Sequence, residues 1–321
     1  MNEEALIIQA TDIARKWGGV STPPRLIKNR ENIVFEVLLK SGDRGALRFH
    51  RPGYQTSTAI NSELLWMEAL AKRNFPCPAP IRTLHGNLTV DFKKHPTTSL
   101  ISWIDAHEIG KVISENPRDP NISLFSDLGR LIAKLHNVTD QIETKTFKRN
   151  SWNEAGFIGD NPLWGKFWEN PSLTPTEAEL LNKIRQTLRP YLKNITNKDF
   201  GLIHADLLQE NILKDSNELW IIDFDDSGFG FREYDLACAL VQHIDNPLFL
   251  EIQSALIESY NDNRVKFDTN PKAVNLFIML RSLASCGWIS SRVPITDERQ
   301  RFYANKALKC IEKFITGFLN N

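Results

Sequence analysis

Two short apolar runs, each ending in polar side chains, dominate the middle of the chain. From Gly201 the sequence reads GLIHADLLQENIL, and from Leu219 it reads LWIIDFDD. Asp206 precedes Asn211 by five residues, and Asp223 follows Asn211 by twelve. Phosphoryl transfer needs a fixed carboxylate that orients an attacking hydroxyl, together with amide and carboxylate oxygens that hold Mg²⁺. The two loops supply such a set.

The order of these residues resembles that of a known group of kinases. His204-x-Asp206, Asn211 and then Asp223-Phe are similar to the catalytic and metal loops of eukaryotic-like kinases. The stretch HADLLQENIL…IIDFDDSGFGFREYDLA resembles the aminoglycoside/choline/homoserine kinase-like phosphotransferase family more than protein kinases. It has no Arg between His and Asp, and an acidic cluster replaces Asp-Phe-Gly. The resemblance is strong over residues 200–240 and weak over most of the remaining chain.

This resemblance implies both a fold and a reaction. The implied fold is α+β and two-lobed like a protein kinase, with a small antiparallel-sheet N-lobe at residues 1–104 and a large, mostly helical C-lobe at 105–321. The implied enzyme moves the γ-phosphoryl of Mg-ATP to a hydroxyl of a small molecule such as an amino alcohol, a sugar or an aminoglycoside. A lone His-x-Asp at a strand end is usually only a polar turn. Here a second polar loop follows it in the sequence, at the place that the resemblance requires.

Each polar residue of the two loops receives an expected role from the resemblance. Asp206 accepts a hydrogen bond from the acceptor hydroxyl and takes its proton late, and His204 orients the loop. Asn211 and Asp223 bind Mg²⁺, and Asp225 is a further metal or acceptor contact. Asp226 ranks lower, because it points the other way if the backbone is extended.

The N-terminal part predicts a buried ion pair. Residues 33–40 and 45–50 form two expected strands, and alternation places Arg48 opposite the apolar face. Arg48 stands where the family usually has its phosphate-binding Lys, and it keeps the charge. The predicted helix Ala59–Lys72 carries Glu63 within its apolar stripe, where a carboxylate requires a charged partner. We expect an Arg48–Glu63 pair; the alternative is Glu63 in water at the edge of the stripe.

Further nucleotide contacts are expected around the N-terminal sheet. Asn32, in the turn at residues 29–32, is a candidate phosphate contact, although a plain hairpin turn explains it equally well. The strand at residues 99–104 ends in an expected hinge, where the backbone of Ser102 and Ile104 meets adenine. Residues 83–92 predict another hairpin, with its turn at residues 86–87.

The C-terminal part is expected to be helical and to support the loops. Asp235 follows the acidic cluster and is expected to brace the catalytic loop or to cap a helix. His136, at the end of a helix that begins near residue 121, is expected to pack and not to react. The aromatic segment 145–173 is either the wall of an acceptor pocket or a satellite core. Arg281, Trp288 and Arg292 are candidates for the acceptor site without a spacing argument.

Composition narrows the possible functions. The 321 residues carry a formal net charge of zero, which gives no reason to expect a nucleic-acid partner. No uninterrupted apolar run reaches the roughly 18 residues of a membrane span. The N-terminus is acidic and amphipathic, unlike a signal peptide, and the four cysteines lack metal or disulfide spacing. We therefore expect a cytoplasmic enzyme without a membrane partner, and the oligomeric state stays open.

Three other functions compete with a small-molecule kinase. A Ser/Thr protein kinase of the same branch would need an activation segment, but only residues 228–232 follow the acidic cluster before the next helix. A catalytically silent nucleotide-binding module is supported by Arg48 alone. A metallohydrolase would use His204, Asp206 and Asp223, but the next histidine, His243, lies on a predicted helix. The acceptor, the choice of ATP or GTP and the number of metal ions stay open.

Overall fold

The computed structural model divides the chain into two compact units. It describes residues 2–29, 32–91, 96–115, 121–193 and 199–319. The first unit contains Met1–His107, Ile142–Arg149 and Leu213–Asp225, and the second contains Glu108–Gln141, Asn150–Ile212 and Asp226–Asn321. Each unit is therefore built from segments that are distant in sequence. The predicted lobes at residues 1–104 and 105–321 stay a prediction.

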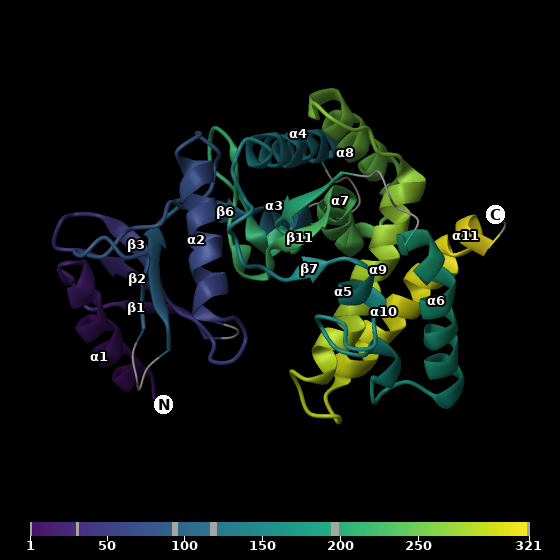
Figure 1. Ribbon diagram of the computed structural model, residues 1–321, viewed down its shortest axis with the longest axis horizontal. Coiled ribbons are helices and arrows are strands. Elements are labelled where there is room, and N and C mark those ends of the chain that lie inside the picture. The colour runs from purple at the N-terminus through teal and green to yellow at the C-terminus, as the bar shows by residue number, and fades with distance from the viewer. Residues whose placement is uncertain (1, 30–31, 92–95, 116–120, 194–198, 320–321) are drawn as a thin grey trace. The chain divides into compact units, whose positions relative to one another are not determined.

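A five-stranded antiparallel sheet forms the centre of the first unit. Its strands are β1 (Arg25–Asn29), β2 (Ile33–Leu38), β3 (Arg44–Phe49), β4 (Thr89–Val90) and β5 (Thr98–Ser102). They lie in the order β1-β2-β3-β5-β4, and every neighbouring pair is antiparallel. Two helices accompany the sheet, α1 (Glu3–Ala14) and α2 (Ser57–Ala71), as Figure 1 shows.

Alternation along β3 separates the two faces of this sheet. Leu47 and Phe49 belong to a buried apolar cluster that also contains Leu6, Ala10, Ile13 and Trp17 from α1 and its short 3₁₀ extension. Arg48, between them in sequence, reaches Glu63 of α2 on the opposite face. One face of β3 thus builds the core with α1, and the other presents charge toward α2.

Two details of the predicted sheet were wrong. Strand β1 was missed, because it is largely exposed and carries Arg25, Lys28 and Asn29, so that it lacks an apolar alternation. The hairpin expected at residues 83–92 is only a turn, with Gly86 at φ +81°, and β4 pairs with β5 instead. Phe92, like residues 30–31 of the expected phosphate turn, lies outside the described residues.

The last segment of the first unit carries the acidic cluster. Strands β9 (Ile212–Lys214) and β10 (Leu219–Ile221) are neighbours in a small sheet that also includes β6 (His107–Glu108). Asp223 follows β10 with φ +63°, and the 3₁₀ turn η4 (Phe224–Asp226) comes next. The extended backbone, which was the condition for ranking Asp226 lower, is therefore not found.

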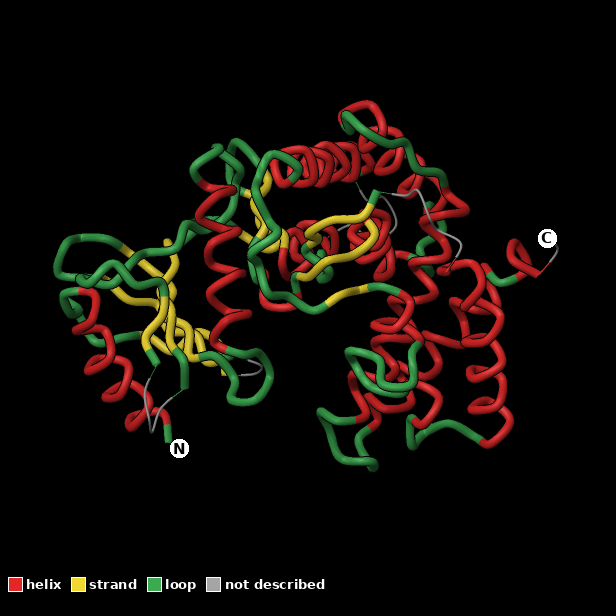
Figure 2. Tube along the Cα trace, viewed as in Figure 1, coloured by secondary structure: helices red, strands yellow, loops and turns green. Residues whose placement is uncertain are grey.

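A small sheet and many helices build the second unit. The sheet has the order β7-β11-β8, from β7 (Ser151–Trp152), β11 (Gly228–Phe231) and β8 (Phe200–Ile203), with β11 antiparallel to β8 and parallel to β7. The helices are α3 (Ile109–Glu115), α4 (Ile122–Thr139), α5 (Glu154–Ile158), α6 (Pro175–Lys193), α7 (Arg232–Leu240), α8 (Phe249–Asn263), α9 (Pro271–Ser290), α10 (Glu298–Phe314) and α11 (Thr316–Leu319). In Figure 2 the described chain after β11 contains helices and loops and no further strand. The predicted α+β class is confirmed.

Helix α9 forms much of the core of this unit. It is the one helix of the described chain that is long and apolar enough to span a membrane, with a mean hydropathy of 1.3 over its most apolar window. Within the fold, 78% of that window is buried, as in the core helix of a globular domain. Its buried positions include Arg281, a charged residue in an apolar environment.

Candidate active site

The loop after β8 carries His204 and Asp206 in a constrained conformation. Ala205, between them, has φ +67°, a conformation that a residue with a side chain adopts only when its surroundings impose it. The constraint comes from Asp235 at the start of α7. Its two carboxylate oxygens accept hydrogen bonds from the backbone amides of His204 (3.0 Å) and Ala205 (2.7 Å). The predicted brace by Asp235 is confirmed.

The two histidines of this region support the loop in different ways. The Nδ1 atom of buried His204 accepts a hydrogen bond from the backbone amide of Asp206, at 3.3 Å. The other histidine, His136 of α4, lies with Nε2 3.1 Å from Asp235 Oδ2 and Nδ1 2.9 Å from the Tyr260 hydroxyl. Burial and the nearby Arg232 lower the pKa of His136 well below its usual value, so its ring is neutral. A neutral ring satisfies both contacts by donating to Asp235 and accepting from Tyr260.

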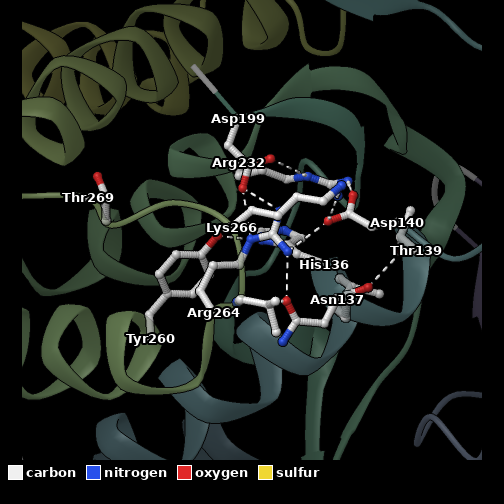
Figure 3. A network of polar contacts seen from close by, with 12 residues as sticks. His136, Asn137, Thr139, Asp140, Asp199, Arg232, Tyr260, Arg264, Lys266 and Thr269 are labelled. Carbon is white, nitrogen blue, oxygen red and sulfur yellow. Dashed lines mark hydrogen bonds and ion pairs between the residues drawn. The ribbon is translucent and has the colours of Figure 1, made fainter. Parts of the chain in front are cut away.

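A buried network of charges stabilises the elements around this loop (Figure 3). Arg264, after α8, binds Asp199 through Nε (2.8 Å) and Nη2 (2.5 Å), and binds Asp140 through Nη1 at 2.8 Å. Arg232, at the start of α7, donates to Asp140 at 2.9 Å. Asp140 follows α4, and Asp199 precedes β8. Two arginines and two aspartates thus compensate one another and connect four of the elements around the loop after β8.

Both oxygens of the Asp206 carboxylate are bound by neighbouring side chains. Its Oδ1 lies 2.6 Å from Arg281 Nη2 of α9, and its Oδ2 accepts from the amide nitrogen of Asn211 at 2.9 Å. The same Asn211 nitrogen donates to the backbone carbonyl of Asp206 at 2.9 Å. The Asp206 side chain remains 19% exposed. With its nitrogen directed at Asp206, Asn211 has its carbonyl oxygen left to serve as a ligand.

The aromatic segment 145–173 contains both buried core residues and a tryptophan that contacts Arg281. Trp152, Phe157 and Phe167 are buried in the second unit, which matches a satellite core. Trp164 instead stacks on the Arg281 guanidinium at 4.5 Å and donates through Nε1 to Asp226 Oδ1 at 3.3 Å. The satellite-core alternative thus holds for the buried aromatic residues, and a wall of an acceptor pocket stays a prediction.

In the first unit the predicted ion pair is confirmed. Arg48 Nη2 lies 2.6 Å from Glu63 Oε1, and both side chains are almost completely buried. Burial alone would lower the pKa of Arg48, but the charges of Glu63 and Asp225 outweigh it and raise that pKa. Arg149 Nη1 lies 3.9 Å from Glu63 Oε2, a neighbour that the sequence did not indicate.

The acidic cluster of the first unit has the oxygen chemistry of a magnesium site. Asp225 is buried, with Oδ1 4.0 Å from His50 Nδ1, and its backbone carbonyl accepts from Gln55 (3.1 Å) and Arg149 (2.5 Å). Burial and the charges of Arg48 and Arg149 lower the pKa of His50 well below its usual value, so this ring is neutral. Hard divalent cations prefer carboxylate oxygens, and within the first unit Asp223 and Asp225 offer that donor type.

The remaining residues that were predicted to contact the nucleotide, Asn32, Ser102 and Ile104, belong to the first unit. Asn32 Oδ1 accepts from the Arg51 amide at 3.1 Å, so this side chain holds the end of β3. The Ser102 amide donates to the Ala79 carbonyl at 2.8 Å, and β5 ends at Ser102. Because that amide is already bonded within the fold, the predicted adenine contact rests chiefly on Ile104, two residues past the strand.

Sequence reasoning named Arg281 as a candidate for the acceptor site and did not find its contact with Asp206. It lies 75 residues after Asp206, on a helix whose apolar composition indicates core, so no spacing connects the two. An arginine in the middle of a 20-residue apolar helix was the only available signal, because a buried guanidinium requires an anionic partner.

Comparisons with known proteins identify the family of this chain. The family model described as "Phosphotransferase enzyme family" (APH) matches residues 25–268. Amicoumacin kinase from Bacillus subtilis (strain 168) is 24% identical over 242 residues, which cover 74% of this chain and 68% of that protein. A homoserine kinase from Agrobacterium fabrum (strain C58) is 27% identical over 180 residues, 54% of this chain and 50% of the relative.

The fold is also found among solved structures. The structure of the microcompartment-associated aminopropanol kinase superposes with a TM-score of 0.81 at 26% identity, covering 97% of this chain and 98% of that one. It confirms the predicted kinase-like fold class, and the relatives named as kinases confirm that the chain is an enzyme. Since the matched region contains both polar loops and covers more than half of the sequence, the chain belongs to the APH phosphotransferase enzyme family.

Proposed function

We propose that this chain transfers the γ-phosphoryl group of ATP, bound with Mg²⁺, to a hydroxyl group of a small molecule. The observation that carries the proposal is the state of Asp206. Its carboxylate is oriented from both oxygens, remains partly exposed, and lies on a loop held by Asp235. This is the arrangement that a hydroxyl-orienting residue requires, because a loose phosphoryl-transfer transition state depends on positioning more than on basicity.

Each residue contributes a defined step to this proposal. Asp206 accepts the hydrogen bond of the acceptor hydroxyl and receives its proton late in the transfer. His204 holds the loop through the Asp206 amide. Asn211 and Asp223 are the proposed metal ligands, with Asp225 as a further oxygen donor. The Mg²⁺ ion, when bound, would neutralise charge on the phosphate oxygens.

The first unit would hold the nucleotide. Arg48 is the proposed phosphate contact, and Glu63 keeps its guanidinium oriented. Asn32 is a proposed contact of the phosphate turn, and the backbone near Ser102 and Ile104 is the proposed adenine contact. These assignments come from the resemblance and the location of each residue.

The proposed acceptor is a small-molecule alcohol. The relatives are named for amicoumacin, homoserine and aminopropanol, so a small acceptor is the property that they share. A cytoplasmic location accompanies the proposal and is supported by the four cysteines, which are all buried and free.

A coupled ADP-release assay tests the proposal. The purified chain is supplied with Mg-ATP and a panel of amino alcohols, sugars, aminoglycosides and a protein mixture. We expect acceptor-dependent ADP release with at least one small alcohol. Release only with the protein mixture would favour a protein kinase, and no release at all would contradict the function.

Two variants separate the proposed roles. Asp206→Asn is expected to lose at least about 100-fold in kcat while ATP binding, measured by calorimetry, stays near the parent value. Asp223→Ala is expected to lose the Mg²⁺-dependent part of ATP affinity. Equal turnover in Asp206→Asn and parent, or an ATP affinity of Asp223→Ala that still responds to Mg²⁺, would refute the corresponding role.

A further inference from the structure

The guanidinium of Arg281 lies at the centre of a set of contacts around Asp206 in the second unit. Nη2 binds Asp206 Oδ1 at 2.6 Å, and Nη1 donates to the Ser285 hydroxyl at 2.5 Å. The ring of Trp164 covers the guanidinium at 4.5 Å, and Trp164 is itself fixed by Asp226. A continuous series of contacts thus leads from Asp226 through Trp164 and Arg281 to Asp206.

These contacts are poorly explained by stability alone. The Arg281 side chain is only 4% exposed, and burying a charge costs more than most ion pairs return. Its Nε–H finds no hydrogen-bond partner among the described residues. An unsatisfied buried donor in a native structure calls for an explanation, and a functional role is one such explanation. An apolar side chain at this position of α9 would avoid both costs.

The geometry of the contact matches a need of the reaction. Arg281 and Asn211 each bind one oxygen of Asp206, so the plane of the carboxylate is determined by two donors from two different elements. Asn211 alone would leave the carboxylate free to rotate about χ2, a broad torsion for Asp. A carboxylate that must point at one hydroxyl gains from a second donor.

We propose that Arg281 is a positioning residue, which holds the Asp206 carboxylate in the orientation required for phosphoryl transfer and is itself held in place by Trp164. The inference rests on the proposed function, since it assigns Arg281 a task in that reaction. Arg281 acts through Asp206 and is not expected to contact the transferred phosphoryl group.

Other charged and titratable groups surround this pair and bear on the pH dependence of its variants. Tyr234 and Cys238 of α7, Asp226 of η4 and Tyr303 of α10 interact electrostatically with Arg281. Glu210 interacts electrostatically with Tyr303 and Lys306, and Lys306 also interacts electrostatically with Arg281. Both signs of charge are present, so a change in kcat at one pH needs comparison across a pH range.

The chain contains a matched control arginine in the same unit. Arg185 of α6 also has a buried side chain, lies 2.6 Å from a carboxylate, Asp160, and stacks on a tryptophan, Trp168, at 4.1 Å. Its carboxylate partner is on the surface and belongs to neither polar loop. Arg185→Met therefore removes the same kind of side chain and the same kinds of contact at a place without a proposed role.

The test compares Arg281→Met, Arg281→Lys and Arg185→Met with the parent, using the acceptor found in the ADP-release assay. We expect Arg281→Met to lose about 100-fold in kcat with KM for ATP within about threefold, and Arg281→Lys to lose about tenfold. Arg185→Met is expected to stay within about threefold of the parent in kcat. In Arg281→Ala, added guanidinium at concentrations far below denaturing ones is expected to restore part of kcat, and the restoration is followed from pH 6 to 9.

Several results would overturn the inference and leave the function intact. One is a kcat of Arg281→Met within threefold of the parent. Another is an equal loss in Arg281→Met and Arg185→Met, which indicates general destabilisation. If Arg281→Met and Arg281→Ala both fail to fold, Arg281→Lys decides. A parent-like kcat of Arg281→Lys overturns the inference, and at least a fivefold loss of kcat at an unchanged urea midpoint supports it. A parent protein that releases no ADP with any acceptor would overturn the proposed function, and the inference with it.

Discussion

Two buried arginine–carboxylate pairs, one in each unit, differ in a way that separates support from reactivity. Arg48–Glu63 and Arg281–Asp206 both close at 2.6 Å, and the arginine side chains are 5% and 4% exposed. The carboxylates differ, since Glu63 is completely buried and Asp206 is 19% exposed. A sealed carboxylate can serve only its partner, whereas a partly exposed one can also meet a substrate. We therefore expect the two ion pairs to have different uses, which the exposure of the acid distinguishes.

The two pairs also differ in how the fold assembles them. Arg48 and Glu63 project from a regular strand and a regular helix only 15 residues apart, β3 and α2. Asp206 lies on a loop with a left-handed residue, and Arg281 comes from a core helix 75 residues later. The support pair is built from local regular structure, and the proposed reactive pair requires the folded helical unit.

The largest expected effect is on stability, when each of the two arginines is replaced in turn. Arg48→Met leaves the Glu63 charge buried, and we expect the free energy of unfolding to fall by about 3–5 kcal/mol. Arg281→Met is expected to cost less, because the partly exposed Asp206 can be solvated again. Urea unfolding of both variants measures the difference. The double variant Arg48→Met/Glu63→Met serves as the control and is expected to regain most of the lost stability, and a larger loss in Arg281→Met than in Arg48→Met would break the comparison.

A third carboxylate, Asp235, sharpens the comparison, because it is buried like Glu63 but is bound by backbone amides of the loop and not by an arginine. Burial raises the pKa of Asp235, although His204 and the two loop amides act in the opposite direction. Asp235→Asn removes an acceptor from the amides of His204 and Ala205, and we expect a loss of about 1–3 kcal/mol and at least a tenfold lower kcat. Steady-state kinetics and urea unfolding measure both.

Asp297→Asn is a matched control for Asp235→Asn, because Asp297 caps α10 in the same unit without a contact to the loop. It is expected to keep the parent kcat. A parent-like kcat in Asp235→Asn would mean that the loop positions Asp206 without its brace.

The smallest expected effect comes from three charged surface residues of the first unit. Arg82 and Lys72 bind Glu68 and lower its pKa to about 2. The partial burial of Glu68 acts in the opposite direction but is outweighed. A lowered carboxylate pKa contributes stability that is fully present above the unfolded value of 4.5 and is lost as pH falls toward 2. Glu68→Gln is therefore expected to cost at most about 1 kcal/mol at pH 7, and less at pH 3. Urea midpoints of parent and variant at both pH values test this, and a difference that grows toward low pH would contradict it.

Much of the fold and part of the site could be predicted from sequence. The α+β class, the helix that carries Glu63 and the Arg48–Glu63 pair are confirmed, because alternation and helical periodicity specify which side chains share a face. The edge strand β1 was missed and the hairpin at residues 83–92 was wrong, since exposed strands lack an apolar pattern and a Gly-Asn turn does not decide which strands pair. The functional roles of Asp206, Asn211 and Asp223 stay predictions.

The sequence by itself determined the order and type of the polar loop residues, and through them the phosphotransferase family, because these properties are local along the chain. Only the tertiary structure decided which side chains complete the site: Arg281 and Trp164 around Asp206, His136 behind Asp235, and Arg149 beside Glu63. Each of these contacts joins residues far apart in sequence, and a buried charge specifies that it needs a partner without specifying which one. Packing of the core helices supplies that choice.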